Sequence, residues 1–224
     1  EMGSSAVASL VYLFDKYGLN DLLMDFILDL DKSLFIFLNS LGSEYFDNFW
    51  LQISTKETWG WLYVFSLMLL LTGKKENFIQ IGFSFYDIKP TYGNWFFFLL
   101  GIILLIVVTD QSSNIFKDYF QRLRPCHDPD LIGLFRCVKD TCGGLYSFFS
   151  AHAANSFAFA TFIFFMTKKP YRNLSLILFI WASVVSYSRI YIGVHFPTDI
   201  IFGAIYGLSA GFVFYKLSLH FMKT

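Results

Sequence analysis

Apolar residues gather into five long stretches that short polar segments separate. The stretches cover residues 59–73, 95–109, 153–167, 174–187 and 200–217. A helix that crosses a bilayer needs about 20 mostly apolar residues. The first three stretches are shorter, so we expect their helices to continue into polar residues, as 110–116 would extend the second. Trp59, Trp61 and Trp95 lie at stretch ends, where interfacial aromatic residues are typical.

Residues 26–41 follow a different pattern. Apolar side chains recur there at helical spacing, next to Asp25, Asp29, Asp31 and Lys32; they are Phe26, Ile27, Leu30, Leu34, Phe35, Leu38 and Leu41. This predicts an amphipathic helix lying in the membrane interface, and a sixth span within residues 1–41 is the alternative. We therefore expect an all-α, polytopic membrane helical bundle with five or six transmembrane helices plus an N-terminal amphipathic helix.

The composition supports a membrane protein over a soluble helical bundle, which could show similar apolar stripes. Only 15% of the 224 residues are charged, 55% are hydrophobic and 21% are aromatic, whereas soluble domains carry about 25% charged residues. The mean hydropathy is +0.52. The formal net charge is zero, so no nucleic-acid partner is indicated.

Basic residues between the stretches indicate sidedness. One set follows the first, third and fifth stretches: Lys74, Lys75, Lys168, Lys169, Arg172, Lys216 and Lys223. The positive-inside rule makes their side cytoplasmic, so residues 111–149 and 189–198 would face the other side. That outer part is itself basic, through Lys117, Arg122, Arg124, Arg136 and Lys139. This many basic residues on the outer side is unusual under the positive-inside rule, and a phosphate-binding role would explain them.

The three cysteines, Cys126, Cys137 and Cys142, fall within this outer segment. Two of them are expected to pair if the segment faces an oxidising compartment. A zinc site is the weaker interpretation, because Cys126 and His127 beside the other two cysteines do not complete a usual ligand set.

The first chemical cluster contains Lys117, Arg124 and Pro125. If the second helix continues as far as Pro125, Lys117 and Arg124 stand about two turns apart on one face. An arginine fork and a lysine ammonium both suit phosphate oxygens. The plainer alternative is a pair of interfacial side chains that reach out of the bilayer.

Two further clusters follow. Ser150 is a good helix N-cap, so backbone N–H groups beside it and His152 could face an anion, although a lone histidine is more often a packing residue. His195 and Asp199 are four residues apart, so the carboxylate can reach the imidazole across one helical turn. Pro197 suits the start of that helix. A purely structural His–Asp bond is the alternative.

In order, the clusters read K-x6-RP, S-x-H and SR-x5-H-x3-D, from Lys117 to Asp199. This resembles the type 2 phosphatidic acid phosphatase family, which shares its core with vanadium haloperoxidases. The resemblance implies a transmembrane phosphatase core over residues 59–224, behind an N-terminal amphipathic region over residues 1–58. It also implies a multi-pass protein of the bacterial inner membrane, with its active site facing the periplasm or the cell exterior.

The resemblance further implies roles for individual residues. His195 would attack phosphorus and form a phosphohistidine, with Asp199 orienting the ring. His152 would protonate the leaving alkoxide and then activate water. The residues that would hold the phosphate oxygens are Lys117, Arg124, Ser150 and Arg189.

No metal and no other cofactor is expected. Asp128 and Asp130, the closest outer carboxylate pair, flank Pro129 and fit a turn better than a ligand set. The expected substrate is a phosphorylated membrane lipid: undecaprenyl diphosphate, phosphatidylglycerophosphate, phosphatidic acid or a lipid A phosphate. A lipid phosphotransferase and a non-catalytic lipid-binding or transport protein are the alternatives.

Phe149 and Ala151 depart from the family's second motif, which usually reads Pro-Ser-Gly-His. The alanine methyl group is harmless only if its backbone φ stays negative. In the last stretch, Gly203, Gly207 and Gly211 form a row of small residues that suits close helix packing, within the chain or between chains.

Overall fold

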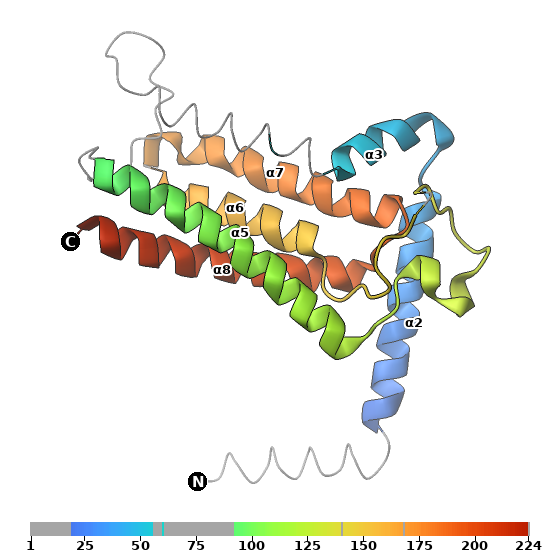
Figure 1. Ribbon diagram of the computed structural model, residues 1–224. Helices are drawn as coiled ribbons and strands as arrows, with labels where there is room; N and C mark the ends of the chain where they lie inside the picture. The colour runs from blue at the N-terminus through green and yellow to red at the C-terminus, as the bar shows by residue number, and fades with distance from the viewer. Residues whose placement is uncertain (1–18, 56–59, 61–91, 140, 168, 224) are drawn as a thin grey trace, which may run out of the picture.

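The computed structural model describes residues 19–55, 60, 92–139, 141–167 and 169–223. Within these ranges the regular structure is helical. The α-helices are α2 (Leu19–Ser40), α3 (Asp47–Ser54), α5 (Tyr92–Phe120), α6 (Ala151–Met166), α7 (Lys169–Tyr191) and α8 (Pro197–Lys223). Short 3-10 turns occupy Glu44–Phe46, Pro125–His127 and Pro129–Leu131. The helices α5 to α8 form a bundle, and α2 crosses one of its ends (Figure 1).

The expected all-helical architecture is confirmed for this part of the chain. Four of the five apolar stretches lie in α5, α6, α7 and α8, and α5 continues through residues 110–116 as expected. Apart from Gly60, the stretch 59–73 lies outside the described residues. By length and composition, Phe96–Phe120 and Pro197–Met222 can each cross a membrane, with mean hydropathies of 2.0 and 1.6. The apolar helices Ala151–Met166 and Ser175–Tyr191 are shorter.

The helix α6 lies at the centre of the bundle and packs against α5, α7 and α8. The small-residue row of α8 faces α6: a methyl group on Gly203, Gly207 or Gly211 would clash with the backbone carbonyls of Ser150, Ala154 and Ala158, respectively. The row therefore serves packing within the chain. A cluster of buried residues from α5, α6 and α8 fills the space towards the far end of the bundle, including Phe98, Phe159, Phe162 and Tyr215.

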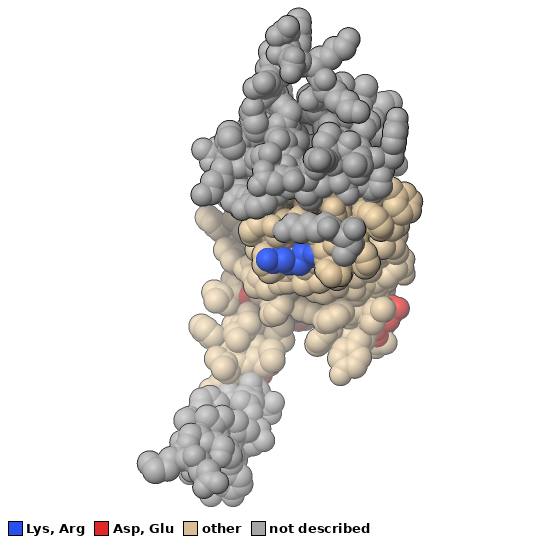
Figure 2. Space-filling model, turned by 90° about the vertical axis from the view of Figure 1, so that its left-hand side faces the viewer, with Lys and Arg blue, Asp and Glu red and all other residues tan. Residues whose placement is uncertain are grey.

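The outer surfaces of α5 and α8 are strongly apolar. Exposed side chains there include Phe96, Ile103, Ile115, Ile201, Phe202 and Val213. Seen from the end of the bundle that carries the C-terminus, the described surface shows very little charge (Figure 2). A soluble protein rarely exposes apolar surface this extensively, and lipid tails are its natural contact.

The helix α2 buries only part of its apolar stripe, together with two polar side chains. Phe26 and Leu30 of that stripe are 64% and 57% exposed, while Asp31, Phe35 and Asn39 are buried. These three are four residues apart, so they form one face of the helix. Asp31 therefore lies on the buried face, a position that its place next to the apolar stripe did not indicate. Phe26, Leu30 and Leu34 of the stripe stay exposed and available to lipid. Phe35 belongs to the buried face, which fixes α2 to the bundle.

Phe35 and Asn39 make that attachment. The Phe35 ring packs edge-on against Phe135 at 5.0 Å and against Phe196 at 5.5 Å, centroid to centroid. The Asn39 amide donates to the carbonyls of Ile190 and Tyr191 at 3.2 and 2.9 Å. Because those carbonyls belong to the end of α7, α2 holds the segment that leads to His195.

Candidate active site

The segment between α7 and α8 carries the third sequence cluster. α7 ends in a tight turn in which the Gly193 N–H donates to the Ile190 carbonyl at 3.0 Å and the Val194 N–H to the Arg189 carbonyl at 3.1 Å. Gly193 has a φ of 84°, and a Cβ there would lie 2.7 Å from the Phe135 ring. Glycine is the residue that meets both demands. The turn directs His195 back into the bundle, where it is 2% exposed.

Asp199 lies in the first turn of α8, which begins at Pro197 as expected. Its Oδ2 lies 3.3 Å from His195 Nδ1 and accepts the Phe196 N–H at 2.9 Å. The expected contact between the carboxylate and the imidazole is thus present. One carboxylate both caps the helix and fixes the orientation of the histidine ring.

Arg122 and Asp31 support Asp199 from behind, and the sequence reading gave them no such role. Arg122 Nη1 donates to Asp199 Oδ1 at 3.1 Å, and Nη2 donates to Asp31 Oδ2 at 2.6 Å. Asp31 also accepts the Thr198 backbone N–H at 2.9 Å. The Arg122 guanidinium lies 4.0 Å over the Phe196 ring. In the sequence, the only indication of a buried Asp31 was its spacing of four residues from Ile27 and from Phe35, which places the three on one helix face.

Arg124 reaches the site by a different route from the one expected. α5 ends at Phe120, where Gln121 adopts a φ of 49°, so the prediction that Lys117 and Arg124 share one helix face is wrong. Arg124 lies instead on an extended segment beside Tyr146. Its Nη1 donates to the Cys142 carbonyl at 2.6 Å and its Nε to the Tyr146 carbonyl at 3.1 Å. Burial lowers the pKa of this guanidinium, and the positive charge has neutral oxygens around it.

Arg189 and Lys117 are the other two cations. Arg189 is buried at the end of α7, and its Nη1 donates to Ser54 of α3. Its Nε has no hydrogen-bond partner among the described residues. Buried donors are nearly always paired in folded proteins, so this N–H is open to an acceptor from outside the described residues. Lys117 Nζ lies 3.4 Å from Ser113 Oγ, one turn back along α5.

The pKa of His195 shows that these cations converge on it. Burial holds that pKa well below its usual value, and the positive charges of Arg189, Arg124 and Lys117 lower it further. The ring is therefore neutral near pH 7. Lys139 contributes a fourth positive charge nearby, since burial and then Arg189 and Arg124 lower its pKa as well. Lys139 was expected only as one of several outer basic residues.

Ser150 and His152 stand at the start of α6. The Ser150 hydroxyl accepts the Ala153 N–H at 3.5 Å, as expected for an N-cap, and the Ser150 N–H donates to the Asp199 carbonyl at 3.1 Å. His152 follows within the first turn, and its carbonyl accepts the Ser156 hydroxyl at 2.8 Å. The structure thus brings the second and third clusters together at one end of the bundle.

The two departures from the family motif fit locally. Among the described residues outside glycine, Gln121 is the only one with a positive φ, so Ala151 meets the condition under which its methyl group is harmless. Phe149 is buried, with its ring centroid 5.2 Å from that of Phe116 and 4.9 Å from that of Tyr206. Aromatic packing fixes the entry to α6 at this position.

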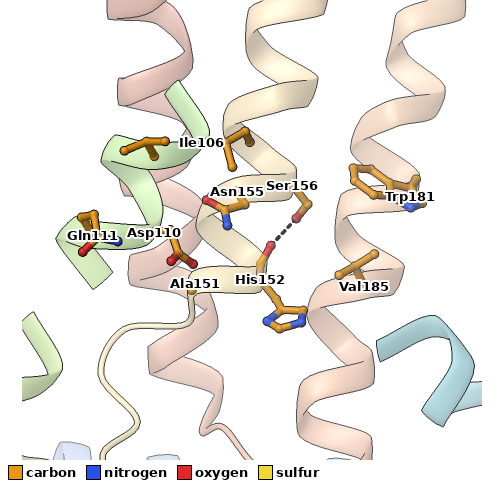
Figure 3. Close-up of a pocket in the computed structure, with 10 residues that line it drawn as sticks. Ile106, Asp110, Gln111, Ala151, His152, Asn155, Ser156, Trp181 and Val185 are labelled. Carbon is orange, nitrogen blue, oxygen red and sulfur yellow. Dashed lines mark hydrogen bonds between the residues drawn. The ribbon is translucent and has the colours of Figure 1, made fainter. Parts of the chain in front are cut away.

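A cavity of about 340 Å³ opens beside His152, between α5, α6 and α7. Ile106 and Asp110 line it from α5, Asn155 from α6, and Trp181 and Val185 from α7 (Figure 3). Lined mainly by apolar side chains with a few polar groups, it has the character of a small ligand site.

The outer loop is held together covalently and by ion pairs. Cys126 and Cys142 form a disulfide, so two of the three cysteines pair as expected, and Cys137 Sγ lies 3.7 Å from Cys142 Sγ. The bond uses the two sulfur atoms that a zinc site with His127 would need as thiolates. Asp128 and Asp130 bind Lys32 of α2, at 3.0 and 2.8 Å, and Asp128 also caps the turn before Asp130.

Comparisons with known proteins agree with this arrangement. The family model of the PAP2 superfamily matches residues 94–223. A lipid A 4'-phosphatase of Porphyromonas gingivalis is 39% identical over 201 residues, which cover 88% of this chain and 76% of the relative. A lipid A 4'-phosphatase of Bacteroides thetaiotaomicron is 33% identical over 198 residues, covering 88% and 80%.

Two crystal structures share the fold. LpxE of Aquifex aeolicus aligns with a TM-score of 0.57 at 23% identity, over 82% of this chain and 93% of that one. A PAP2-type phosphatidylglycerolphosphate phosphatase of Bacillus subtilis aligns with a TM-score of 0.62 at 16% identity, over 87% of both chains. The resemblance that the three motifs indicated is confirmed: this chain belongs to the PAP2 superfamily, as a membrane lipid phosphatase.

Proposed function

We propose that this protein hydrolyses the 4'-phosphate of lipid A through a phosphohistidine on His195. Both curated relatives described above carry the name lipid A 4'-phosphatase, at 39% and 33% identity over 88% of the chain. Of the lipid classes that the sequence left open, lipid A phosphate is therefore the one we select.

One observation supports the phosphatase site above the others. Three cations, Lys117, Arg124 and Arg189, act on the buried His195, and the hydrogen bonds described for them go to neutral oxygens. The carboxylate of Asp199 acts on Lys117 and Arg124 from a distance, but it is already paired with Arg122. Buried positive charge in excess of its countercharges is costly, and a phosphate group would neutralise it. The site is therefore electrostatically incomplete until an anion binds.

The residues then divide the reaction between them. Lys117, Arg124, Arg189 and the start of α6 at Ser150 hold the phosphate oxygens. With Nδ1 of His195 directed at Asp199, Nε2 attacks phosphorus while the bond from phosphorus to the 4'-oxygen breaks, and His152 gives its proton to that oxygen. His152 next takes a proton from water, which attacks phosphorus and breaks the P–N bond. Inorganic phosphate leaves, and both histidines return to their starting states.

No metal takes part in this scheme. The three side-chain cations supply the positive charge that stabilises the transition state, in the way that fixed dipoles and charges do in other phosphoryl-transfer sites. EDTA should accordingly leave the rate unchanged. Inhibition by EDTA that added magnesium reverses would contradict the scheme.

We also propose the finer topology that the sequence indicated. Five or six spans make up the membrane part, and residues 59–224 form the phosphatase core. In the N-terminal region, residues 1–58, α2 lies in the membrane interface. The site faces the periplasm or the cell exterior. The apolar stripe of α2 and its crosswise position support this arrangement. Labelling of single cysteines placed in the 129–134 turn and near the C-terminus, in intact cells, would test the orientation.

The direct test is phosphate release from lipid A by the detergent-purified protein and by His195→Ala. Losing the nucleophile should lower turnover by about 10⁴-fold or more, while Asp118→Asn, an exposed change on α5, should retain it. With 32P-labelled lipid A, rapid quenching in alkaline detergent should trap 32P on the wild-type protein alone, because the P–N bond of a phosphohistidine survives alkali but not acid. Substantial turnover by His195→Ala would remove it as the nucleophile. If phosphate were transferred faster to an added acceptor lipid than to water, the protein would be a phosphotransferase and not a hydrolase.

A further inference from the structure

The cavity beside His152 lies deeper in the bundle than the phosphate-binding cations. On α7, Val185 in its wall precedes Arg189 by one helical turn. On α5, Asp110 precedes Lys117 by seven residues, about two turns. His152 joins the two regions, because it lines the cavity and begins α6 next to Ser150 (Figure 3). A phosphate ester held by the cations would therefore direct its leaving group past His152 into this space.

The cavity has two kinds of wall. Ile106, Trp181 and Val185 give it apolar surface. Asp110 and Asn155 give it a polar side where α5 meets α6 (Figure 3). The Asn155 carbonyl oxygen accepts the Thr109 hydroxyl, and this bond fixes the amide beside the carboxylate. Such a combination suits a ring with C–H faces and a few polar substituents better than it suits an alkyl chain alone.

Asp110 is the unusual member, because carboxylates are rare and costly within membrane helices and commonly mark a functional position. It is half-buried on a helix that is otherwise apolar over 96–109. An ionised carboxylate only accepts hydrogen bonds. The part of the substrate beside Asp110 must then offer an N–H or O–H group.

We infer that this cavity is the subsite for the sugar to which the phosphate is attached, and that Asp110 selects for it by accepting a hydrogen bond from an amide or hydroxyl group. The inference rests on the proposed function and names the specificity of the same site. The glucosamine unit of lipid A offers such donors. The diacylglyceryl part of bound phosphatidic acid offers only ester oxygens, which give the Asp110 carboxylate no hydrogen-bond donor.

The test compares two substrates and three variants. Wild type, Asp110→Leu, Asp110→Asn and Asp118→Leu are assayed on lipid A and on dioleoyl phosphatidic acid in the same mixed micelles. Asp110→Leu should lower kcat/KM on lipid A by about 10- to 100-fold, the range expected when a hydrogen bond to a charged group is lost. On phosphatidic acid it should leave kcat/KM unchanged or higher. Asp110→Asn, which keeps an acceptor oxygen, should fall between, and Asp118→Leu should match wild type on both.

A binding measurement separates this inference from the proposed function. Lipid A binding is measured with His195→Ala, which cannot turn over by the proposed scheme, and with His195→Ala/Asp110→Leu. The dissociation constant for lipid A should be at least about 10-fold lower for the single variant than for the double variant. Equal binding, or an equal loss on both lipids in the kinetic assay, would overturn the sugar subsite. Turnover of phosphatidic acid with none of lipid A would overturn it too, while leaving a lipid phosphatase in place.

Discussion

Arg122 and Arg124 are two residues apart on the same segment, yet their surroundings are opposite. Arg122 lies between the carboxylates of Asp31 and Asp199, at 2.6 and 3.1 Å. Arg124 donates to the neutral carbonyls of Cys142 and Tyr146. Carboxylates of the protein neutralise the charge of Arg122. The charge of Arg124 has no ion pair in the described residues and stays available to a bound phosphate.

The comparison shows how one segment serves two purposes. Successive side chains of an extended backbone point to opposite sides, so residues two apart should point to the same side. The turn at Gln121 and the disulfide-linked loop instead give each arginine its own partners. An arginine is therefore a candidate for phosphate binding because its partners are neutral, and its presence in a motif is not sufficient.

The largest effect is expected from Arg122→Met. It leaves two buried carboxylates without their cation, which costs about 3–5 kcal/mol when a buried ion pair is broken. The midpoint of thermal unfolding in detergent should fall clearly, and activity should fall with it because Asp199 loses its support. Arg122→Met/Asp31→Leu removes both charges of one pair and should recover part of the loss. A double variant no more stable than Arg122→Met would argue against the Asp31–Arg122 pair as the cause.

Arg124→Gln should give the converse result. Removing one fixed donor to the transition-state charge typically costs about 10²- to 10³-fold in rate, so kcat on lipid A should fall by this amount. The unfolding midpoint should stay the same or rise, because the removed charge makes no ion pair of its own and Asp199, the carboxylate that acts on it, stays paired with Arg122. A strongly destabilised Arg124→Gln with near-normal turnover would erase the contrast between the two arginines.

A smaller effect is expected from opening the Cys126–Cys142 disulfide. Cys142 presents the carbonyl that Arg124 Nη1 binds, so reduction should loosen this arginine while the Tyr146 carbonyl still holds Nε. A hydrogen bond to a charged group contributes about 1.5–3 kcal/mol, so weakening this one should lower activity by about tenfold. Activity is measured with and without dithiothreitol, with Cys126→Ser/Cys142→Ser as the control that should not respond. Equal sensitivity of that double variant would place the effect elsewhere.

The smallest change concerns pH. The pKa of His195 lies below its ordinary value, in part through Lys117, so the neutral nucleophile persists to lower pH than an ordinary histidine would. The acidic limb of kcat/KM should thus lie below about pH 6.5. In Lys117→Met the pKa of His195 should rise, and the limb should move to higher pH. Both proteins use one substrate, so its own ionisation cancels. An unmoved limb would mean that Lys117 does not act on His195.

The sequence predicted the bundle and the contact between His195 and Asp199 because both depend on local spacing. A stretch of apolar residues needs no partner to form a helix in lipid, and four residues separate a histidine from a carboxylate by one turn. The cysteine pairing was predicted only to the extent that two of three would bond. The choice of Cys126 with Cys142 depends on the path of the loop, which local spacing does not determine.

Two features escaped prediction for the same reason. Arg124 leaves the helix because the chain turns at Gln121, four residues before the proline that was expected to end it. Asp31 is buried because a segment 91 residues further along supplies Arg122 as its partner. A charged residue can occupy a buried helix face when its partner comes from elsewhere, and hydrophobic periodicity within one helix carries no information about that partner.

The glycine row of α8 has a consequence for motion. The backbone of α6 lies directly on Gly203, Gly207 and Gly211, so the two helices pack with their backbones in close contact. We expect His152 on α6 and Asp199 on α8 to move together as one unit through the reaction cycle. The helices α5 and α7 pack against this unit and form the other walls of the cavity. We therefore expect the movement that admits a lipid or releases the product to come from these two helices.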